Sequence, residues 1–244
     1  MKILNNLVES IQPYPVKEIF AGVFDTVVWS KNLGLASTIQ EKEAPHQGIK
    51  EAGNLINKSA RELSQYVFSD NWLEASLGMA AINSALPIEQ EKLRTINAQE
   101  IIMKKGKRRI VGVIGHFPFL EKIGQEFKKM YIFEKLPKKN DLREEDIPKY
   151  LPEADVVAIT STSLTNHTFE NIIKFVNKGS YVIMLGPTTP VSPILFDYGV
   201  DAISGLFVRK ENINFVITQV KEATPYRYIK GKEYVTILKE DYID

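Results

Sequence analysis

Apolar and polar positions follow helical and strand periodicities along the first hundred residues. The stretch 3–11 has apolar residues at helical spacing and predicts a helix. Residues 16–39 form β-branched and aromatic clusters separated by short polar turns, which predicts an antiparallel meander. Further helices are expected after Ser59–Glu62, Asn71–Glu74 and Asn97–Glu100, because each segment matches a helix-capping box. This order is typical of an α+β unit.

The pattern changes after Gly106, where short apolar runs begin to alternate with helical segments. Five runs predict buried strands, at 110–114, 130–133, 154–160, 181–185 and 202–208. The alternation predicts a doubly wound parallel sheet with right-handed crossovers, and the tail after Thr224 predicts one extra strand. We therefore expect two domains, an N-terminal α+β domain of residues 1–105 and a C-terminal α/β domain of residues 106–244.

The charge balance argues against nucleic acid and membrane partners. The 244 residues include 31 basic and 30 acidic side chains, so no overall field attracts a polyanion. The apolar runs are much shorter than a membrane span, and the first ten residues lack the long apolar region of a secretory signal. We expect a cytoplasmic protein with a small-molecule ligand. The sequence leaves open whether it forms a homo-oligomer.

The chain has no cysteine, which excludes disulfides, thiolate nucleophiles and iron–sulfur clusters. Imidazole comes only from His46, His116 and His167. His116 directly follows a predicted strand, where it could act as an acid or base, a hydrogen-bond donor or a metal ligand. Its alternative is a loop histidine that donates to a carbonyl. His167 is either a ligand or a polar residue at a helix start. His46 lies in an irregular loop near Glu41 and Glu43, as a ligand or a solvated side chain.

Polar residues gather where the predicted parallel strands end, which is where ligands bind in open α/β sheets. The predicted ligand-binding residues are Gly115, Phe117, Thr160, Ser161, Thr162, Asn166, Gly186, Pro187, Thr188 and Thr189, with His116 as the acid/base candidate. The loop Gly186–Pro190 precedes Ser192-Pro193, a signature of a helix N-terminus that favours an anion. The alternative is that these residues only shape the turn and cap the helix.

Several cofactor and catalytic motifs are absent from the sequence. The first strand–helix turn, Gly112–His116, is not G-x-G-x-x-G, which argues against NAD. The phosphate loop of NTPases, the H-E-x-x-H helix of zinc proteases and the G-x-S-x-G elbow of serine hydrolases are also missing. The cofactor is therefore unknown, with a metal ion or a metal–ligand complex left open.

Three segments resemble the signature blocks of the "putative heavy-metal chelation" family: Gly115–Phe119, Ala154–Thr168 and Leu185–Asp201. The first half, with Gly34–Thr38 and Glu74–Asn83, resembles the domain that accompanies them. The resemblance covers nearly the whole chain. It implies an enolase-N-terminal-like α+β domain followed by a Rossmann-like domain, and it carries over no reaction and no catalytic residue.

Two functional hypotheses follow. The first is an enzyme or binding protein that holds an anionic or heterocyclic, metal-chelating metabolite in the cleft between the domains. The alternative is a non-catalytic heavy-metal or metal-complex binding protein that uses His116, His167 and either His46 or a glutamate of the first domain as ligands. Soft metals prefer thiolate and thioether ligands, so direct chelation in this chain would depend on imidazole and carboxylate groups.

Overall fold

The first half of the chain folds around a three-stranded antiparallel sheet. In the computed structural model, which describes residues 1–39 and 48–242, β1 (Glu18–Ala21), β2 (Asp25–Trp29) and β3 (Leu33–Ser37) pair in chain order. The helices of this half are α1 (Lys2–Ser10), α2 (Ala60–Ser64) and α3 (Trp72–Ala85). The predicted first helix and meander are thereby confirmed.

Capping and small residues explain how α2 and α3 form and pack. Ser59 caps α2 with the reciprocal bonds of a capping box, since its Oγ accepts from the Glu62 amide and the Glu62 carboxylate accepts from the Ser59 amide. At Gly78 of α3, an added Cβ would lie only 2.0 Å from the Val67 amide nitrogen. At Gly34 of β3 it would lie 2.0 Å from the Ala80 carbonyl oxygen. Close backbone approach therefore requires glycine at both positions.

The second half forms a mostly parallel six-stranded sheet in the order β5-β4-β6-β7-β8-β9. The strands are β4 (Ile110–Ile114), β5 (Lys129–Phe133), β6 (Val156–Thr160), β7 (Tyr181–Leu185), β8 (Ala202–Val208) and β9 (Lys232–Leu238). Strands β4 to β8 are parallel, and β9 pairs antiparallel with β8 as the extra strand. Because β5 and β6 lie on opposite sides of β4, the sheet has a topological switch point at β4.

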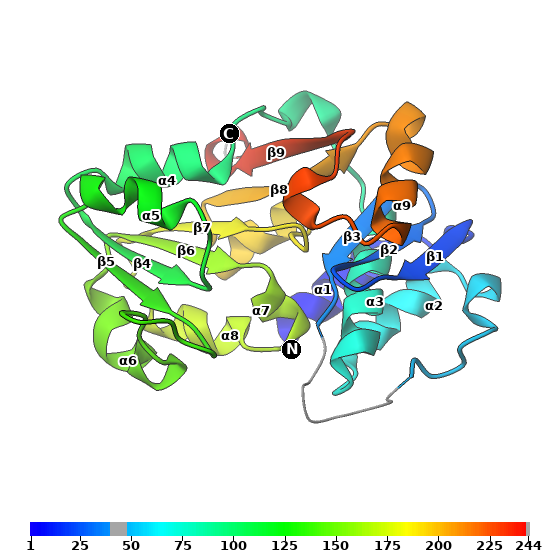
Figure 1. Ribbon diagram of the computed structural model, residues 1–244, viewed down its shortest axis with the longest axis horizontal. Coiled ribbons are helices and arrows are strands. Elements are labelled where there is room, and N and C mark those ends of the chain that lie inside the picture. The colour runs from blue at the N-terminus through cyan, green and yellow to red at the C-terminus, as the bar shows by residue number, and fades with distance from the viewer. Residues whose placement is uncertain (40–47, 243–244) are drawn as a thin grey trace.

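Helices cover both faces of this sheet (Figure 1). α4 (Ala98–Gly106) and α5 (Leu120–Ile123) pack on one face, in an apolar cluster with Val113 and Ala158. α6 (Ile147–Tyr150), α7 (Thr162–Thr165) and α8 (Phe169–Ile172) pack on the other face, in a cluster with Phe133 and Ile159. The last helix, α9 (Ile213–Lys221), connects β8 to the chain that leads into β9.

Several crossover helices are short. α5 and α8 are single turns that continue as 3₁₀ turns, and the segment after Ser192 is the 3₁₀ helix Pro193–Tyr198. The Ser192 hydroxyl does accept from the Ile194 amide, and Gly199 ends the segment with φ of 86°. Apolar spacing places the buried side chains of these connections correctly, but it cannot show how soon the chain must turn to reach the next strand.

The two halves meet through buried apolar side chains. Val216 and Val220 of α9 pack with Val27 and Leu35 of the first sheet, and Figure 1 shows α9 in orange beside that sheet. A larger apolar cluster extends from Met79 of α3 to Met184 of β7. The structure thus differs from the open cleft expected between the domains, because hydrocarbon fills these contacts.

Helix α4 belongs spatially with the second sheet, since Ile102 packs on its strands. The domain limit between residues 105 and 106 stays a prediction, and the packing of α4 favours a limit before Asn97. No helix within residues 1–39 and 48–242 combines the length and apolar character needed to cross a membrane.

Candidate functional site

The register of the parallel strands brings four loops to one edge of the sheet. Ile114 at the end of β4 pairs with Phe133 of β5 and with Ile159 of β6. Thr160 then pairs with Leu185 at the end of β7. The loops that follow these strands leave the sheet side by side, so this edge is where the fold collects polar side chains.

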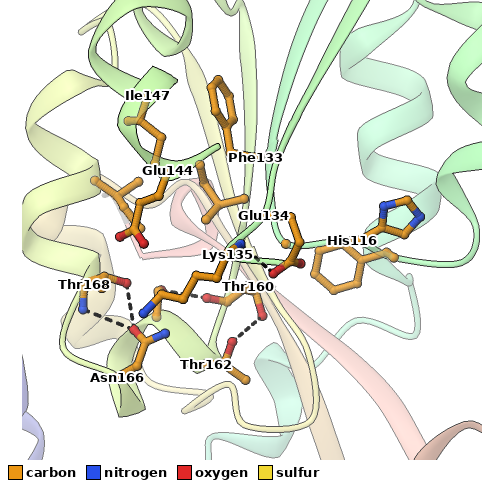
Figure 2. A pocket seen from close by; sticks show the side chains of 15 residues that line it. His116, Phe133, Glu134, Lys135, Glu144, Ile147, Thr160, Thr162, Asn166 and Thr168 are labelled. Atoms are coloured by element: carbon orange, nitrogen blue, oxygen red, sulfur yellow. Dashed lines mark hydrogen bonds between the residues drawn. The ribbon is translucent and has the colours of Figure 1, made fainter. Parts of the chain in front are cut away.

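A pocket of about 230 Å³ opens at this edge, at the switch point next to β4. We call it the polar pocket. Its lining comes from the ends of β4, β5 and β6 and from α6 to α8, and comprises Ile114, Gly115, His116, Phe117, Phe133, Glu134, Lys135, Glu144, Ile147, Thr160, Thr162, Ser163, Asn166, Thr168 and Ile172. Figure 2 shows Lys135, Glu144, Asn166 and Thr168 gathered at the opening, with His116 to one side.

Hydroxyl and amide groups on the loop after β6 form one wall of the polar pocket. Thr160 and Thr162 share a hydrogen bond of 2.9 Å between their hydroxyls. The Asn166 side-chain oxygen accepts from the Thr168 hydroxyl at 2.7 Å and from the Thr168 amide at 3.3 Å. These bonds fix the Asn166 amide so that its nitrogen is left to donate to a ligand.

Lys135 places a positive charge opposite that wall. Figure 2 shows its side chain extending toward Asn166, with the carboxylate of Glu144 also facing the opening. The ammonium lies 5.2 Å from the ring centre of Trp72, the first residue of α3, which is a cation–π contact with the first half of the chain. Within the described residues it forms no salt bridge. Glu134 and Glu144 also line the pocket, so Lys135 is suited to one acidic group of a ligand, at the end of the pocket next to Asn166.

His116 lies at the edge of the polar pocket, apart from Lys135 and Asn166 (Figure 2). Its Nδ1 is 3.0 Å from the Asp141 carboxylate, which also accepts from the Lys138 amide. Because a carboxylate accepts, Nδ1 carries a proton, and in the neutral form of the imidazole Nε2 is then the base or ligand atom. Nε2 is buried and has no hydrogen-bond partner among the described groups.

The structure brings six of the predicted residues together in the polar pocket: Gly115, His116, Phe117, Thr160, Thr162 and Asn166. The others lie elsewhere. Gly186 and Pro187 line a second cavity on the α4 face of the sheet, together with Phe117. Ser161, Thr188 and Thr189 are buried and outside both linings. The predicted residues that line these two cavities are therefore divided between the two faces of the sheet.

Thr188 connects the two halves of the protein. Its hydroxyl accepts from the Ser37 amide at 2.9 Å, and its carbonyl accepts from the Asn83 side chain at 3.1 Å. Asn83 also donates to the Leu35 carbonyl. These bonds satisfy backbone groups at the end of β3 and in the loop after β7, so the Thr188 hydroxyl holds a domain contact in place of the expected ligand.

Gly186 and Ser161 pack against each other at the point where β6 and β7 end. Gly186 has φ of 124°, and an added Cβ would lie 2.9 Å from the Ser161 hydroxyl oxygen. That oxygen is buried and has no partner among the described groups. Glycine is required here by backbone conformation and by space, so the turn-shaping alternative describes this position.

His167 also contacts the first half. It has φ of 62°, and its Nε2 is 2.7 Å from the Val67 carbonyl oxygen, to which it donates. His167 therefore donates to the first half of the chain and does not line the polar pocket beside His116. Residues 1–39 and 48–242 contain no group of three or more His, Cys, Asp or Glu side chains able to hold a metal. His46, Glu41 and Glu43 lie outside the described residues.

Asp25 is a buried acid that the sequence did not single out. Its side chain is 2% exposed, and neither carboxylate oxygen has a hydrogen-bond partner in the described part of the chain. Burial raises the pKa of Asp25 from 3.8 to about 7, and the charge of Lys232 partly opposes that rise. In the sequence it reads only as a polar residue at the start of a strand, so its burial could not be predicted.

Lys135, Glu144 and Asp141 were missed for a related reason, since they lie in a loop without periodicity.

Known proteins share this architecture along the whole chain. A protein of unknown function from Desulfitobacterium hafniense, of the DUF364 family, has a solved structure with a TM-score of 0.82 and 26% identity, covering 98% of this chain and 97% of that one. A DUF364 protein from Pyrococcus horikoshii gives a TM-score of 0.82 at 21% identity, covering 97% and 98%, and supports the fold alone. An uncharacterised protein of Methanocaldococcus jannaschii is 27% identical over 206 residues, which are 80% of this chain and 79% of that protein.

Two family profiles divide the chain between them. The DUF4213 profile matches residues 4–86 and the DUF364 profile matches residues 97–239, and both are described as "putative heavy-metal chelation". The second match begins at the start of α4. Because this match alone spans more than half of the residues, the chain belongs to the "putative heavy-metal chelation" family DUF364.

Proposed function

We propose that this protein binds a small anionic, metal-chelating metabolite in the polar pocket. The observation that carries the proposal is the convergence of Lys135, Asn166 and Thr162 on one opening from two different strand ends. Lys135 supplies charge, and the amide and hydroxyl groups supply directional hydrogen bonds. The volume of about 230 Å³ is below the 300–1,000 Å³ of drug-sized sites, so the ligand is small.

His116 is the acid/base candidate if the bound molecule reacts. The Asp141 carboxylate orients the imidazole, as carboxylates do for bases and for metal-bound histidines. The family description adds heavy-metal chelation. The chain has no cysteine and five methionines, so we expect a soft metal to arrive as a complex with the small ligand.

A titration calorimetry experiment with oxalate, malonate and citrate tests this proposal. Lys135→Gln should weaken the best of these ligands about tenfold, which is the usual contribution of a charge-assisted hydrogen bond. The matched control is Lys139→Gln, which removes an exposed lysine of the same loop that does not line the pocket. Equal affinities in the two variants, or no binding of any carboxylate, would refute the polar pocket as an anion site.

The second candidate is direct metal binding, which the buried, unpartnered Nε2 of His116 favours. Zinc chloride alone is the probe. If Zn²⁺ binds without a carboxylate ligand and His116→Ala abolishes that binding, the result supports direct metal binding. If His116→Ala leaves carboxylate affinity intact and Zn²⁺ binds only with citrate present, metal enters as a complex.

A further inference from the structure

A second and larger cavity lies at the same edge of the sheet, on the face covered by α4. Its volume of about 710 Å³ falls within the 300–1,000 Å³ typical of small-molecule sites. The N-terminus of α4, the loops after β4 and β7, strands β8 and β9 and the 3₁₀ turn Tyr226–Tyr228 surround it. It shares only Phe117 with the polar pocket. We call it the aromatic pocket.

Two aromatic pairs form the walls of the aromatic pocket. Phe117 and Phe119 stack with their ring centres 5.6 Å apart and 22° between the ring planes. Tyr226 and Tyr234 meet edge to face, with ring centres 6.2 Å apart. Rigid aromatic faces that lose little conformational entropy on binding make their best contacts with another planar ring. The shape and surface of the cavity therefore favour a planar aromatic ligand.

The charge of the lining is positive. Arg227 is the charged residue among the described lining residues, and it is exposed with no salt bridge to a described residue. The Lys232 ammonium, which does not line the cavity and donates to the Ile229 carbonyl oxygen, lies behind the tyrosine wall at 5.1 Å from the ring centre of Tyr226 and 5.3 Å from that of Tyr234. The N-terminus of the nine-residue helix α4 opens on the same cavity, where Asn97 and the first-turn carboxylate of Glu100 cap it. Arg227 is therefore the group that complements an acidic substituent on the ligand.

Asp25 opposes such a ligand less than an ordinary carboxylate would near neutral pH. It acts on Tyr226 and Lys232 from the first half of the chain, but burial raises its pKa to about 7. The acid is therefore half protonated near pH 7 and more so below it. Burial and Tyr234 also raise the pKa of Tyr226, so its hydroxyl stays neutral and able to donate.

We propose that the aromatic pocket binds a planar aromatic or heteroaromatic acid. The ring lies against the Phe117–Phe119 and Tyr226–Tyr234 pairs, and the acidic group faces Arg227. This second site goes beyond the proposed anion site, because it has its own cation and a different kind of wall. The two proposals can fail separately, since Lys135 belongs only to the polar pocket and Arg227 only to the aromatic pocket.

The test is a calorimetric titration with 2-naphthoate as the probe, beside the neutral analogue 2-naphthylmethanol and the non-aromatic cyclohexanecarboxylate. We expect 2-naphthoate to bind about tenfold more tightly than either analogue. Arg227→Gln should weaken 2-naphthoate about tenfold and leave 2-naphthylmethanol unchanged. The matched control Lys230→Gln removes an exposed charge of the same connection that does not line the cavity, and it should bind like the wild type.

Arg227 is exposed, so its replacement should fold, and a thermal melt of the variant verifies this. A second variant, Tyr234→Ala, removes part of one aromatic wall and should weaken both naphthalene probes equally. The proposal is overturned if 2-naphthoate does not bind at millimolar concentration. It is also overturned if Arg227→Gln and Lys230→Gln have the same effect, or if the three probes bind alike.

Discussion

The polar pocket and the aromatic pocket occupy opposite faces of one sheet edge, yet they have opposite chemistry. The polar pocket is walled by threonines, Asn166 and Lys135. The aromatic pocket is three times larger by volume, 710 against 230 Å³, and is walled by phenylalanine and tyrosine pairs. Both depend on the loop after β4, which contributes Phe117 to each.

The comparison shows that strand ends alone do not determine what a site binds. Register brings the residues to one edge, but the alternation of the chain after each strand decides which face a side chain reaches. Thr160 and Thr162 face α8, whereas Gly186 and Pro187 open on the side of α4. A doubly wound sheet can therefore offer two separate sites at one edge.

The largest expected effect is on stability, and it concerns Asp25, the buried acid whose charge acts on Tyr226 of the aromatic pocket. Asp25 has no hydrogen-bond partner in the described structure, whereas Asp141 beside the polar pocket accepts two hydrogen bonds. Folding raises the pKa of Asp25 from its ordinary value of 3.8 to about 7, because burial disfavours the charged carboxylate. The unfolded chain therefore loses this proton first, and stability falls as the pH rises from about 4 to about 7.

Asp25→Asn should accordingly raise the free energy of unfolding at about pH 8, by at most about 4 kcal/mol. The gain should shrink to below about 1 kcal/mol at about pH 4, where the wild-type acid is protonated in the folded state and only partly ionised in the unfolded state. Guanidinium unfolding at the two pH values measures the difference. Asp141→Asn is the matched variant, and it should destabilise the protein because it weakens two bonds. An equal stability change at both pH values would contradict the assignment for Asp25.

The next effect concerns the turn between the two pockets. Gly186→Ala forces a side chain into φ of 124° and within 2.9 Å of the Ser161 hydroxyl. We expect a loss of about 1–3 kcal/mol in unfolding free energy. Gly179→Ala serves as the control, because the nearest atom to its added Cβ is 3.6 Å away and its φ is not in the left-handed region. Ser161→Ala in the Gly186→Ala background should not recover the whole loss, since the φ strain remains.

The smallest expected effect is on ligand affinity, and it concerns Phe117, the residue that lines both pockets. Phe117→Leu keeps an apolar side chain but removes one ring of the Phe117–Phe119 stack. We expect about a two- to tenfold loss of affinity for 2-naphthoate, the contribution of an aromatic pair. Oxalate affinity in the polar pocket should change less than about twofold, because its predicted partners are Lys135, Asn166 and Thr162. A larger change for oxalate than for 2-naphthoate would reverse the assignment of the two pockets.

The sequence was a good guide to the strands and a partial guide to the site. The predicted runs 110–114, 181–185 and 202–208 coincide with β4, β7 and β8, because continuous apolar runs report burial on both faces. Apolar spacing indicates the crossover helices but not their lengths, because it does not show how soon the chain must turn toward the next strand.

The contacts of two predicted site residues have a tertiary origin. Thr188 and His167 are polar residues at strand and helix ends, as ligand-binding residues are, but their partners are the Ser37 amide and the Val67 carbonyl of the other half. Such pairings depend on how the halves dock, which no local pattern encodes. The division of the strand ends between two pockets could not be predicted either. Gly115 and Gly186 each directly follow an apolar strand, yet Gly115 lines the polar pocket and Gly186 the aromatic pocket.

The central claim is that one sheet edge carries two independent sites, and a crossed titration tests it most directly. Lys135→Gln and Arg227→Gln are each titrated with 2-naphthoate and with the best-binding small carboxylate. The prediction is a crossed pattern, in which Lys135→Gln loses about tenfold for the carboxylate alone and Arg227→Gln about tenfold for 2-naphthoate alone. If either variant weakens both probes equally, the two pockets act as one site and the claim fails.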